Sequence, residues 1–168
     1  ELIEGILQRK DVLGIMPTGA GKSLCYQVPA LMLDGITIVV SPLISLMTDQ
    51  VKALNQAGVH AAYINSSLTE NQIRTALFYA AQGRYKIIYV APERLNTIRF
   101  LEFACQVDIS MVTVDEAHCI SQWGQDFRPS YVGIADFLAQ LPKRPAENAF
   151  PATATERVKQ DIMGSLRL

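Results

Sequence analysis

The chain has 168 residues, of which 49% are hydrophobic and 18% are charged. This length and composition support one sizeable core, so we treat residues 1–168 as a single globular domain. The formal net charge of −1 excludes a generally basic coat for nucleic acid, and any such contact must come from a local patch. Three cysteines without CxxC spacing predict free thiols, no disulfide and no zinc. No apolar run reaches membrane-spanning length and no signal peptide is evident, so we expect a cytoplasmic protein without membrane association.

Short β-rich runs alternate with longer helical patterns along the chain, which is typical of a parallel sheet covered by helices on both faces. The first helical stripe is made by Leu2, Ile3, Ile6 and Leu7, and the chain opens within that helix, as a truncated domain would. We expect strands over residues 11–16, 36–40, 60–64, 85–90 and 111–114. We expect further helices over residues 22–33, from Thr69 to Gly83, over 96–104 and from about Thr155.

The stretch MPTGAGKS, residues 16–23, joins the first expected strand to a helix. Its glycines let backbone N–H groups close on phosphate oxygens, and the helix N-terminus favours negative charge. The pattern GxxxxGK[ST] begins with glycine, whereas this chain has Met16. An ordinary glycine-rich turn is the alternative, but it gives no reason for lysine followed by serine. The predicted nucleotide-binding residues are Thr18, Gly19, Ala20, Gly21, Lys22 and Ser23.

A second polar stretch follows the apolar strand at residues 111–114, where Asp115 and Glu116 come at its carboxyl end. Ligands bind at that end of the strands in α/β sheets. In P-loop ATPases a strand-end aspartate and the loop serine hold Mg²⁺, and a neighbouring acid orients or deprotonates the attacking water. A solvated acidic turn is the alternative. Together with Lys22 and Ser23, the pair predicts an ATP and Mg²⁺ site.

Five ordered stretches resemble the first RecA-like motor domain of RecQ-family DNA helicases, within helicase superfamily two. They are MPTGAGKSLCYQVPA at 16–30, SPLISLMTDQV at 41–51, INSSLT at 64–69, APERL at 91–95 and DEAHCISQWGQDFRPSY at 115–131. The resemblance implies a three-layer P-loop NTPase domain with a mostly parallel central sheet. It also implies that ATP hydrolysis drives unwinding of duplex DNA with three-prime to five-prime polarity.

The segment after the DEAH residues resembles the aromatic-rich loop that senses single-stranded DNA in this family. Trp123, Phe127 and Arg128 occupy its positions, and Gln125 stands where the family usually has histidine. Aromatic rings offer faces on which unpaired bases stack, and arginine adds a phosphate or cation–π contact. Core packing of Trp123 and Phe127 is the alternative. We hypothesise that DNA at Trp123 repositions the residues that handle the attacking water.

Three further residues acquire roles only from the resemblance. His118 would link the ATP site to the rest of the motor, although a surface histidine after an acidic turn is the alternative. Ser41 and Arg94 match family positions near the DNA track. A helix cap and a surface ion pair explain them nearly as well.

Two departures from the family pattern are relevant here. One puts in doubt the coupling of ATP hydrolysis to domain movement, and the other concerns the fold of one strand. Pro151 replaces the first threonine of a Thr-Ala-Thr motif and removes a hydroxyl and a backbone donor. Glu147 and Asn148 interrupt the apolar character of the preceding strand, so we expect that strand to be an edge or locally irregular.

The resemblance implies parts that lie outside this chain, because the motor needs a second RecA-like domain carrying an arginine finger. No counterpart of the family's adenine-reading glutamine precedes Glu1. We therefore expect a domain truncated at both ends and nearly inactive alone. Expected partners are single-stranded and duplex DNA and the second motor domain, in the nucleoid of a bacterium or the nucleus of a eukaryote. A nucleotide-gated nucleic-acid-binding module and an RNA helicase remain the alternatives.

Overall fold

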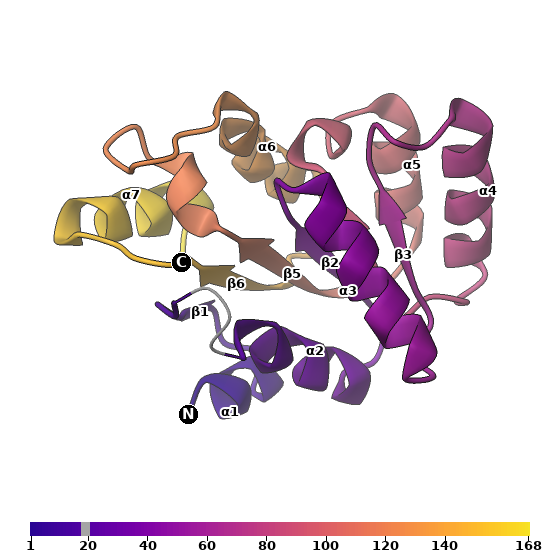
Figure 1. Ribbon diagram of the computed structural model, residues 1–168, viewed down its shortest axis with the longest axis horizontal. Coiled ribbons are helices and arrows are strands. Elements are labelled where there is room, and N and C mark those ends of the chain that lie inside the picture. Colours follow the sequence, from indigo (N-terminus) through magenta and orange to yellow (C-terminus); the bar gives the residue numbers. More distant parts are fainter. Residues whose placement is uncertain (18–20) are drawn as a thin grey trace.

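A computed structural model describes residues 1–17 and 21–168. In this part of the chain, six parallel strands form one sheet in the order β1-β6-β5-β2-β4-β3 (Figure 1). The strands are β1 (Val12–Leu13), β2 (Ile36–Val40), β3 (Ala61–Ile64), β4 (Ile87–Val90), β5 (Ile109–Asp115) and β6 (Ala146–Phe150). The expected parallel α/β architecture is confirmed.

Helices cover both faces of the sheet, as Figure 1 shows. They are α1 (Leu2–Leu7), α2 (Lys22–Met32), α3 (Ile44–Gln56), α4 (Glu70–Ala81), α5 (Ile98–Gln106), α6 (Gly133–Gln140) and α7 (Glu156–Leu166). Buried side chains of α1, α2 and α3 form one apolar cluster with the sheet, and those of α4 to α7 form the other. The domain therefore has three layers, with β2 and β5 buried in the middle one.

Local sequence signals set several helix starts. Thr69 caps α4 by accepting the N–H of Gln72, whose side chain accepts the N–H of Thr69 in return. This capping box satisfies donors that the first turn would otherwise leave unpaired. Thr155 caps α7 in a similar way by accepting the N–H of Val158. Both starts agree with the sequence prediction.

The prediction that the strand containing Glu147 and Asn148 is an edge or irregular is wrong. Strand β6 lies between β1 and β5, and its register with β5 is continuous from Ala146 to Phe150. Glu147 is tolerated there because Arg144 lies 3.4 Å away and because Asp11 accepts its backbone N–H at 3.0 Å. The interior of the sheet thus accommodates an acidic residue beside one partner that is near in sequence, Arg144, and one that is remote, Asp11.

All six strands are parallel, so their carboxyl ends meet at one edge of the sheet. Ser41 follows β2, Glu116 follows β5 and Pro151 follows β6 at this edge, and the described residues 14–17 follow β1 there. The topology therefore brings the polar stretches predicted from sequence to one place. Among the residues that the structure describes, no helix is long and apolar enough to cross a membrane.

Candidate nucleotide site and adjoining aromatic loop

The start of α2 supplies one wall of the site. Gly21 precedes the helix with φ +73°, a left-handed conformation that glycine adopts without strain. No atom of the described residues lies within 4 Å of the position of an added Cβ. Lys22 and Ser23 are the first two residues of α2; Lys22 is buried and Ser23 is half-buried. The predicted nucleotide-binding residues Thr18, Gly19 and Ala20 lie outside the described residues.

The turn after β5 supplies the opposite wall. Asp115 ends the strand and accepts the backbone N–H of Glu116 on Oδ1 at 3.0 Å. Glu116 has a positive φ of 50°, which is uncommon for a residue other than glycine and marks a sharp local turn. A short 3-10 helix, Ala117–Ile120, follows it. The buried hydroxyl of Tyr131 donates to the Asp115 carbonyl oxygen at 2.8 Å and fixes this turn from behind.

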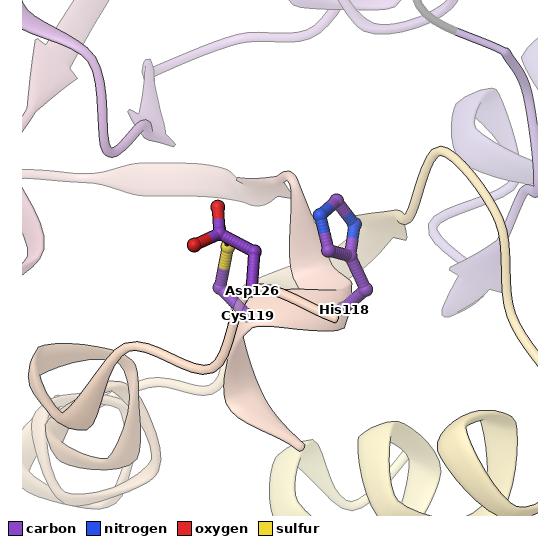
Figure 2. Close-up of side chains that lie close together, drawn as sticks. All are labelled: His118, Cys119 and Asp126. Carbon is purple, nitrogen blue, oxygen red and sulfur yellow. Dashed lines mark hydrogen bonds between the residues drawn. The ribbon is translucent and has the colours of Figure 1, made fainter. Parts of the chain in front are cut away.

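Three side chains with metal-ligand atoms gather on this turn, and Figure 2 shows them together. One ligand atom each from His118, Cys119 and Asp126 lies within 4.8 Å of the others. The Cys119 thiol donates to Asp126 at 3.8 Å, and Arg128 donates to the same carboxylate at 3.4 Å. Burial, reinforced by Asp126, raises the pKa of Cys119 to about 12, so the sulfur stays a thiol. Asp126 thus accepts hydrogen bonds from Cys119 and Arg128, whereas His118 has other partners. The predicted absence of zinc stays a prediction.

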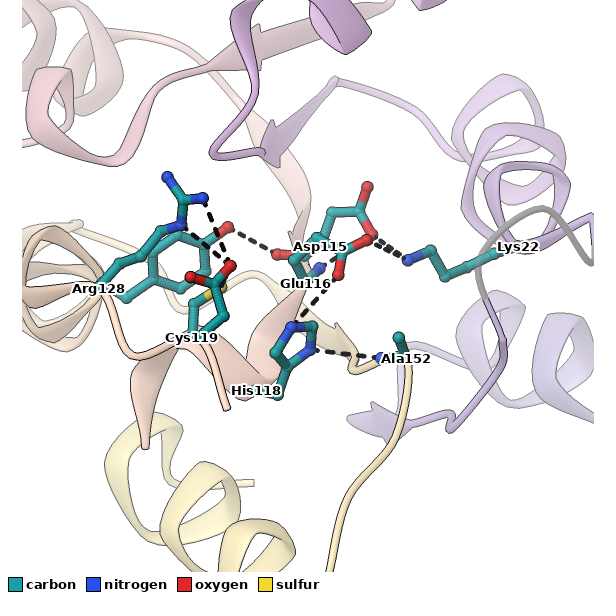
Figure 3. A network of polar contacts seen from close by, with 9 residues as sticks. Lys22, Asp115, Glu116, His118, Cys119, Arg128 and Ala152 are labelled. Atoms are coloured by element: carbon teal, nitrogen blue, oxygen red, sulfur yellow. Dashed lines mark hydrogen bonds and ion pairs between the residues drawn. The ribbon is translucent and has the colours of Figure 1, made fainter. Parts of the chain in front are cut away.

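The two walls meet through Lys22 (Figure 3). Its Nζ lies 2.9 Å from Oδ1 of Asp115 and 2.9 Å from Oε1 of Glu116. All three side chains are largely buried, with 8%, 7% and 16% exposed. The lysine and the acidic pair, separated by more than ninety residues in sequence, form one charge cluster. The prediction that they are partners is therefore supported by direct contact.

The electrostatics of this cluster follow from burial and charge. Burial opposes the charge of Lys22, but Asp115 and Glu116 outweigh it and leave the pKa of the ammonium raised. Burial raises the pKa of Asp115, and the nearby lysine opposes that change. A buried carboxylate needs a cation to offset its desolvation. Here the ammonium fills that need.

His118 connects this cluster to the end of β6. Its Nε2 lies 3.4 Å from Oε2 of Glu116, and its Nδ1 accepts the backbone N–H of Ala152 at 3.4 Å (Figure 3). Pro151 removes a donor one residue earlier, but its own carbonyl accepts the N–H of Met16 at 3.3 Å. The segment that contains Pro151 therefore contacts the turn after β5 through His118 and the residues after β1 through Met16.

Residues 121–128 form a loop after the 3-10 helix Ala117–Ile120, and we call it the aromatic loop. It contains the aromatic residues that were predicted to bind DNA. Trp123 is 60% exposed, which excludes the core-packing alternative for this residue. Phe127 and Arg128 are half-buried, and Gln125 is exposed. The backbone N–H of Arg128 donates to the carbonyl of Cys119 at 2.9 Å, so the loop folds back on the turn after β5.

Ser41 and Arg94 lie in other surroundings. Ser41 is 1% exposed, and its Oγ has no hydrogen-bond partner among the described residues. Arg94 is half-buried and lies 3.4 Å from Glu70, as the ion-pair alternative expects. Their proposed contacts with DNA stay predictions.

Three contacts at or beside the candidate site were missed from the sequence. Tyr131 stood in a recognised stretch but had no assigned role, and the Ala152 amide is a backbone group without a residue-type signal. Arg157 covers the ring of Trp123, with its guanidinium carbon 3.4 Å from the ring centroid. A basic residue in the first turn of a helix gives no sequence pattern that points to such a partner.

The arrangement is the one expected of a nucleotide-binding site on a parallel α/β domain. A helix N-terminus, a lysine and two strand-end acids converge at the carboxyl edge of the sheet. The family model of the DEAD/DEAH box helicases matches residues 1–162. The chain belongs to this family.

Within this family, the chain is clearly similar to RecQ helicases. The chain is 51% identical over 160 residues to the ATP-dependent DNA helicase RecQ of Bacillus subtilis, an alignment that covers 95% of this chain and 27% of that protein. It is 46% identical over 168 residues to RecQ of Pasteurella multocida, covering 100% of this chain and 26% of the relative. The expected similarity to RecQ helicases is confirmed, and the chain spans about a quarter of the length of these relatives.

Solved structures agree with the fold. The Hef helicase domain of Pyrococcus furiosus matches with a TM-score of 0.70 at 18% identity, over 99% of this chain and 36% of that one. A hypothetical ATP-dependent RNA helicase from Sulfolobus tokodaii matches with a TM-score of 0.75 at 22% identity, over 99% of this chain and 48% of that one. At these identities the likeness concerns the fold alone.

Proposed function

We propose that this chain is the ATP-binding motor domain of a DNA helicase, which in the intact protein couples ATP hydrolysis to three-prime to five-prime unwinding. One observation carries the proposal: the Lys22 ammonium is 2.9 Å from both Asp115 and Glu116. These are the groups that a P-loop ATPase uses on phosphate, metal and water respectively. The high identity to RecQ proteins supports DNA as the polymer.

The residues divide the reaction among them. Lys22 leaves the acidic pair to contact the β- and γ-phosphates of ATP, which frees both carboxylates. Ser23 and Asp115 would hold Mg²⁺, which neutralises phosphate charge when bound. Their oxygen ligands fit that ion, because the burial of Asp115 favours a cation beside its carboxylate. Glu116 orients the attacking water and accepts its proton, and His118 holds Glu116 and the end of β6 together.

The isolated chain should turn over ATP very slowly. An arginine finger typically contributes about 10³ to 10⁵ in rate, and in this proposal it comes from a second RecA-like domain of the same polypeptide. The larger size of the relatives is consistent with such a domain. In a bacterium we place the intact protein in the cytoplasm at the nucleoid, and in a eukaryote in the nucleus.

The DNA contact is assigned to the aromatic loop. Exposed Trp123 offers a stacking face for an unpaired base, and half-buried Arg128 offers a cation for a phosphate. Base stacking on an aromatic side chain contributes roughly 1–3 kcal/mol per base. With a net charge of −1, the domain relies on this local surface rather than on a basic coat.

The deciding experiment measures steady-state ATPase of the intact protein with single-stranded DNA, duplex DNA and RNA. We expect single-stranded DNA to give the largest stimulation. Glu116→Gln should lower the stimulated rate about 10²- to 10⁴-fold while nucleotide binding persists, and Glu102→Gln on the exposed face of α5 should change neither. A larger response to RNA would favour an RNA helicase.

The same experiment distinguishes a helicase motor from the non-catalytic alternative. A nucleotide-gated binding module would change its affinity for single-stranded DNA on ATP addition, without stimulated hydrolysis or unwinding. That outcome is the one expected if Gln125 and Pro151 uncouple the motor. The contact of His118 with the Ala152 amide supports the coupled enzyme instead.

A further inference from the structure

Helix α7 makes a direct contact with the aromatic loop. The guanidinium carbon of Arg157, in the first turn of α7, lies over the indole of Trp123 at 3.4 Å from the ring centroid. Trp123 is nevertheless 60% exposed, so the arginine leaves much of the indole open to solvent. A cation over a tryptophan face is attracted by the ring electrons and restricts the ring's orientation.

A second contact anchors the same loop one turn further along α7. Asp161 accepts the hydroxyl of Ser121 at 2.7 Å, and the same Ser121 oxygen accepts the N–H of Trp123 at 3.2 Å. Ser121 is 1% exposed, so this link is shielded from water. The backbone and the ring of Trp123 are therefore each held by α7, through different residues.

The chain enters α7 directly from the segment that contacts the catalytic histidine. The Ala152 N–H donates to His118, and the cap residue Thr155 follows three positions later. A single continuous stretch, residues 152–161, thus contacts the ATP site at one end and the aromatic loop at the other.

We propose that Arg157 and Asp161 are positioning residues that hold Trp123 as a stacking platform for an unpaired base and that tie this platform, through α7, to His118. The inference deepens the proposed function and depends on Trp123 binding nucleic acid. Arg157 covers part of the indole, a base stacks on the open part, and movement of the ring displaces the start of α7. The ligand class is single-stranded nucleic acid.

Intrinsic fluorescence tests the contact, because Trp123 is the only tryptophan in the 168-residue chain. Arg157→Ala should change the accessibility of Trp123 to acrylamide. In a fluorescence titration with oligothymidylate, the apparent Kd of the variant should be about two- to five-fold higher than that of the wild type. Arg157→Lys should resemble Arg157→Ala, because lysine keeps the charge but loses the planar stacking group. In the intact protein, Arg157→Ala should raise the DNA concentration for half-maximal ATPase by a similar factor.

Lys159→Ala is the matched control, because it removes a positive charge from the same helix, where Lys159 contacts Glu156 at 3.5 Å. We expect Lys159→Ala to leave acrylamide quenching unchanged and to weaken DNA binding less than Arg157→Ala does. At the other contact, Asp161→Asn should preserve the fluorescence response that Asp161→Ala loses, since an amide oxygen still accepts the Ser121 hydroxyl.

The outcomes distinguish this inference from the proposed function. If oligothymidylate leaves the wild-type fluorescence unchanged, the assignment of DNA to the aromatic loop fails and this inference fails with it. If the wild type responds and the Arg157 variants respond equally, only the positioning role is overturned. Tighter binding by Arg157→Ala would mean that the arginine competes with the base, which also overturns it.

Discussion

Gly124 packs against the carbonyl oxygen of His118 so closely that a Cβ at this position would lie 2.8 Å from that oxygen. The obstructing atom belongs to the backbone of the turn after β5 and cannot rotate away. Glycine is therefore required here for close approach. A side chain at position 124 would therefore push the aromatic loop away from the turn after β5.

We expect Gly124→Ala to displace the loop and to destabilise the fold by about 1–3 kcal/mol. Nucleotide binding should persist because Lys22 and Asp115 are untouched, whereas stimulation of ATPase by single-stranded DNA should fall. Gly164→Ala is the control: no atom lies within 4 Å of an added Cβ there, so helix propensity should leave stability equal or raised. Unchanged stimulation in Gly124→Ala would contradict the expectation.

Removing Lys22 should destabilise the domain as well as abolish nucleotide binding. Lys22→Ala leaves Asp115 and Glu116 facing each other without their ammonium, a loss on the order of 3 kcal/mol for a buried pair. Asp115, whose pKa is already raised by burial, should titrate higher in the variant. As the pH falls, Asp115 is protonated and its uncompensated charge disappears. The loss of stability of Lys22→Ala relative to the wild type should therefore become smaller in acid.

Urea unfolding of Lys22→Ala at several pH values measures this deficit. Lys52→Ala, which removes an exposed lysine from α3, provides the comparison and should behave like the wild type. A Lys22→Ala deficit that grows as the pH falls would contradict the charge argument.

Glu147 should make stability fall as the pH rises. Burial, with Asp11 nearby and Arg144 opposing, raises the pKa of Glu147 from its ordinary 4.5 to about 7. The folded protein keeps a proton that the unfolded chain releases between these values, so the free energy of unfolding declines across that window. The decline is on the order of 3 kcal/mol, at about 1.4 kcal/mol per pH unit.

Glu147→Gln isolates this contribution, because glutamine stays neutral at every pH. We expect the variant to match the wild type near pH 4 and to exceed its stability at pH 8, as measured by urea unfolding. Glu102→Gln, at an exposed position on α5, should leave the pH profile unchanged. Parallel profiles for Glu147→Gln and the wild type would show that Glu147 titrates normally.

The cysteines should differ in reactivity. Cys119 is 0% exposed and its pKa is raised to about 12, so little reactive thiolate forms at neutral pH. Cys105 is exposed. Iodoacetamide followed by mass spectrometry should label Cys105 in the native protein and Cys119 only after denaturation. Rapid labelling of Cys119 in the native protein would mean that the segment after β5 opens readily.

Sequence patterns predicted most of the framework because the decisive signals are local. The apolar run at β2 and the capping box at Thr69 lie within a few residues of the elements that they define. Strand β5 extends beyond the predicted 111–114 in both directions, and α5 begins at Ile98 rather than at 96. Such end positions depend on neighbouring strands and helices, which short sequence windows do not contain.

The errors and omissions concern contacts between distant residues. Glu147 suggested an edge strand because its partners, Asp11 and Arg144, could not be assigned before the fold was known. Arg157 gave no signal because its partner, Trp123, lies on a separate loop. Lys22 and Asp115 were placed at one site because both motifs follow expected strands of a parallel sheet, whose carboxyl ends bind ligands.

The contact between His118 and position 152 has an evolutionary consequence. Its donor is a main-chain amide, so the hydrogen bond is indifferent to which side chain occupies position 152, provided that it is not proline. Nineteen residue types offer the same N–H group, whereas few side chains replace an imidazole acceptor. Mutations can therefore accumulate at position 152 without touching this connection, while the histidine that receives it has far less freedom to change.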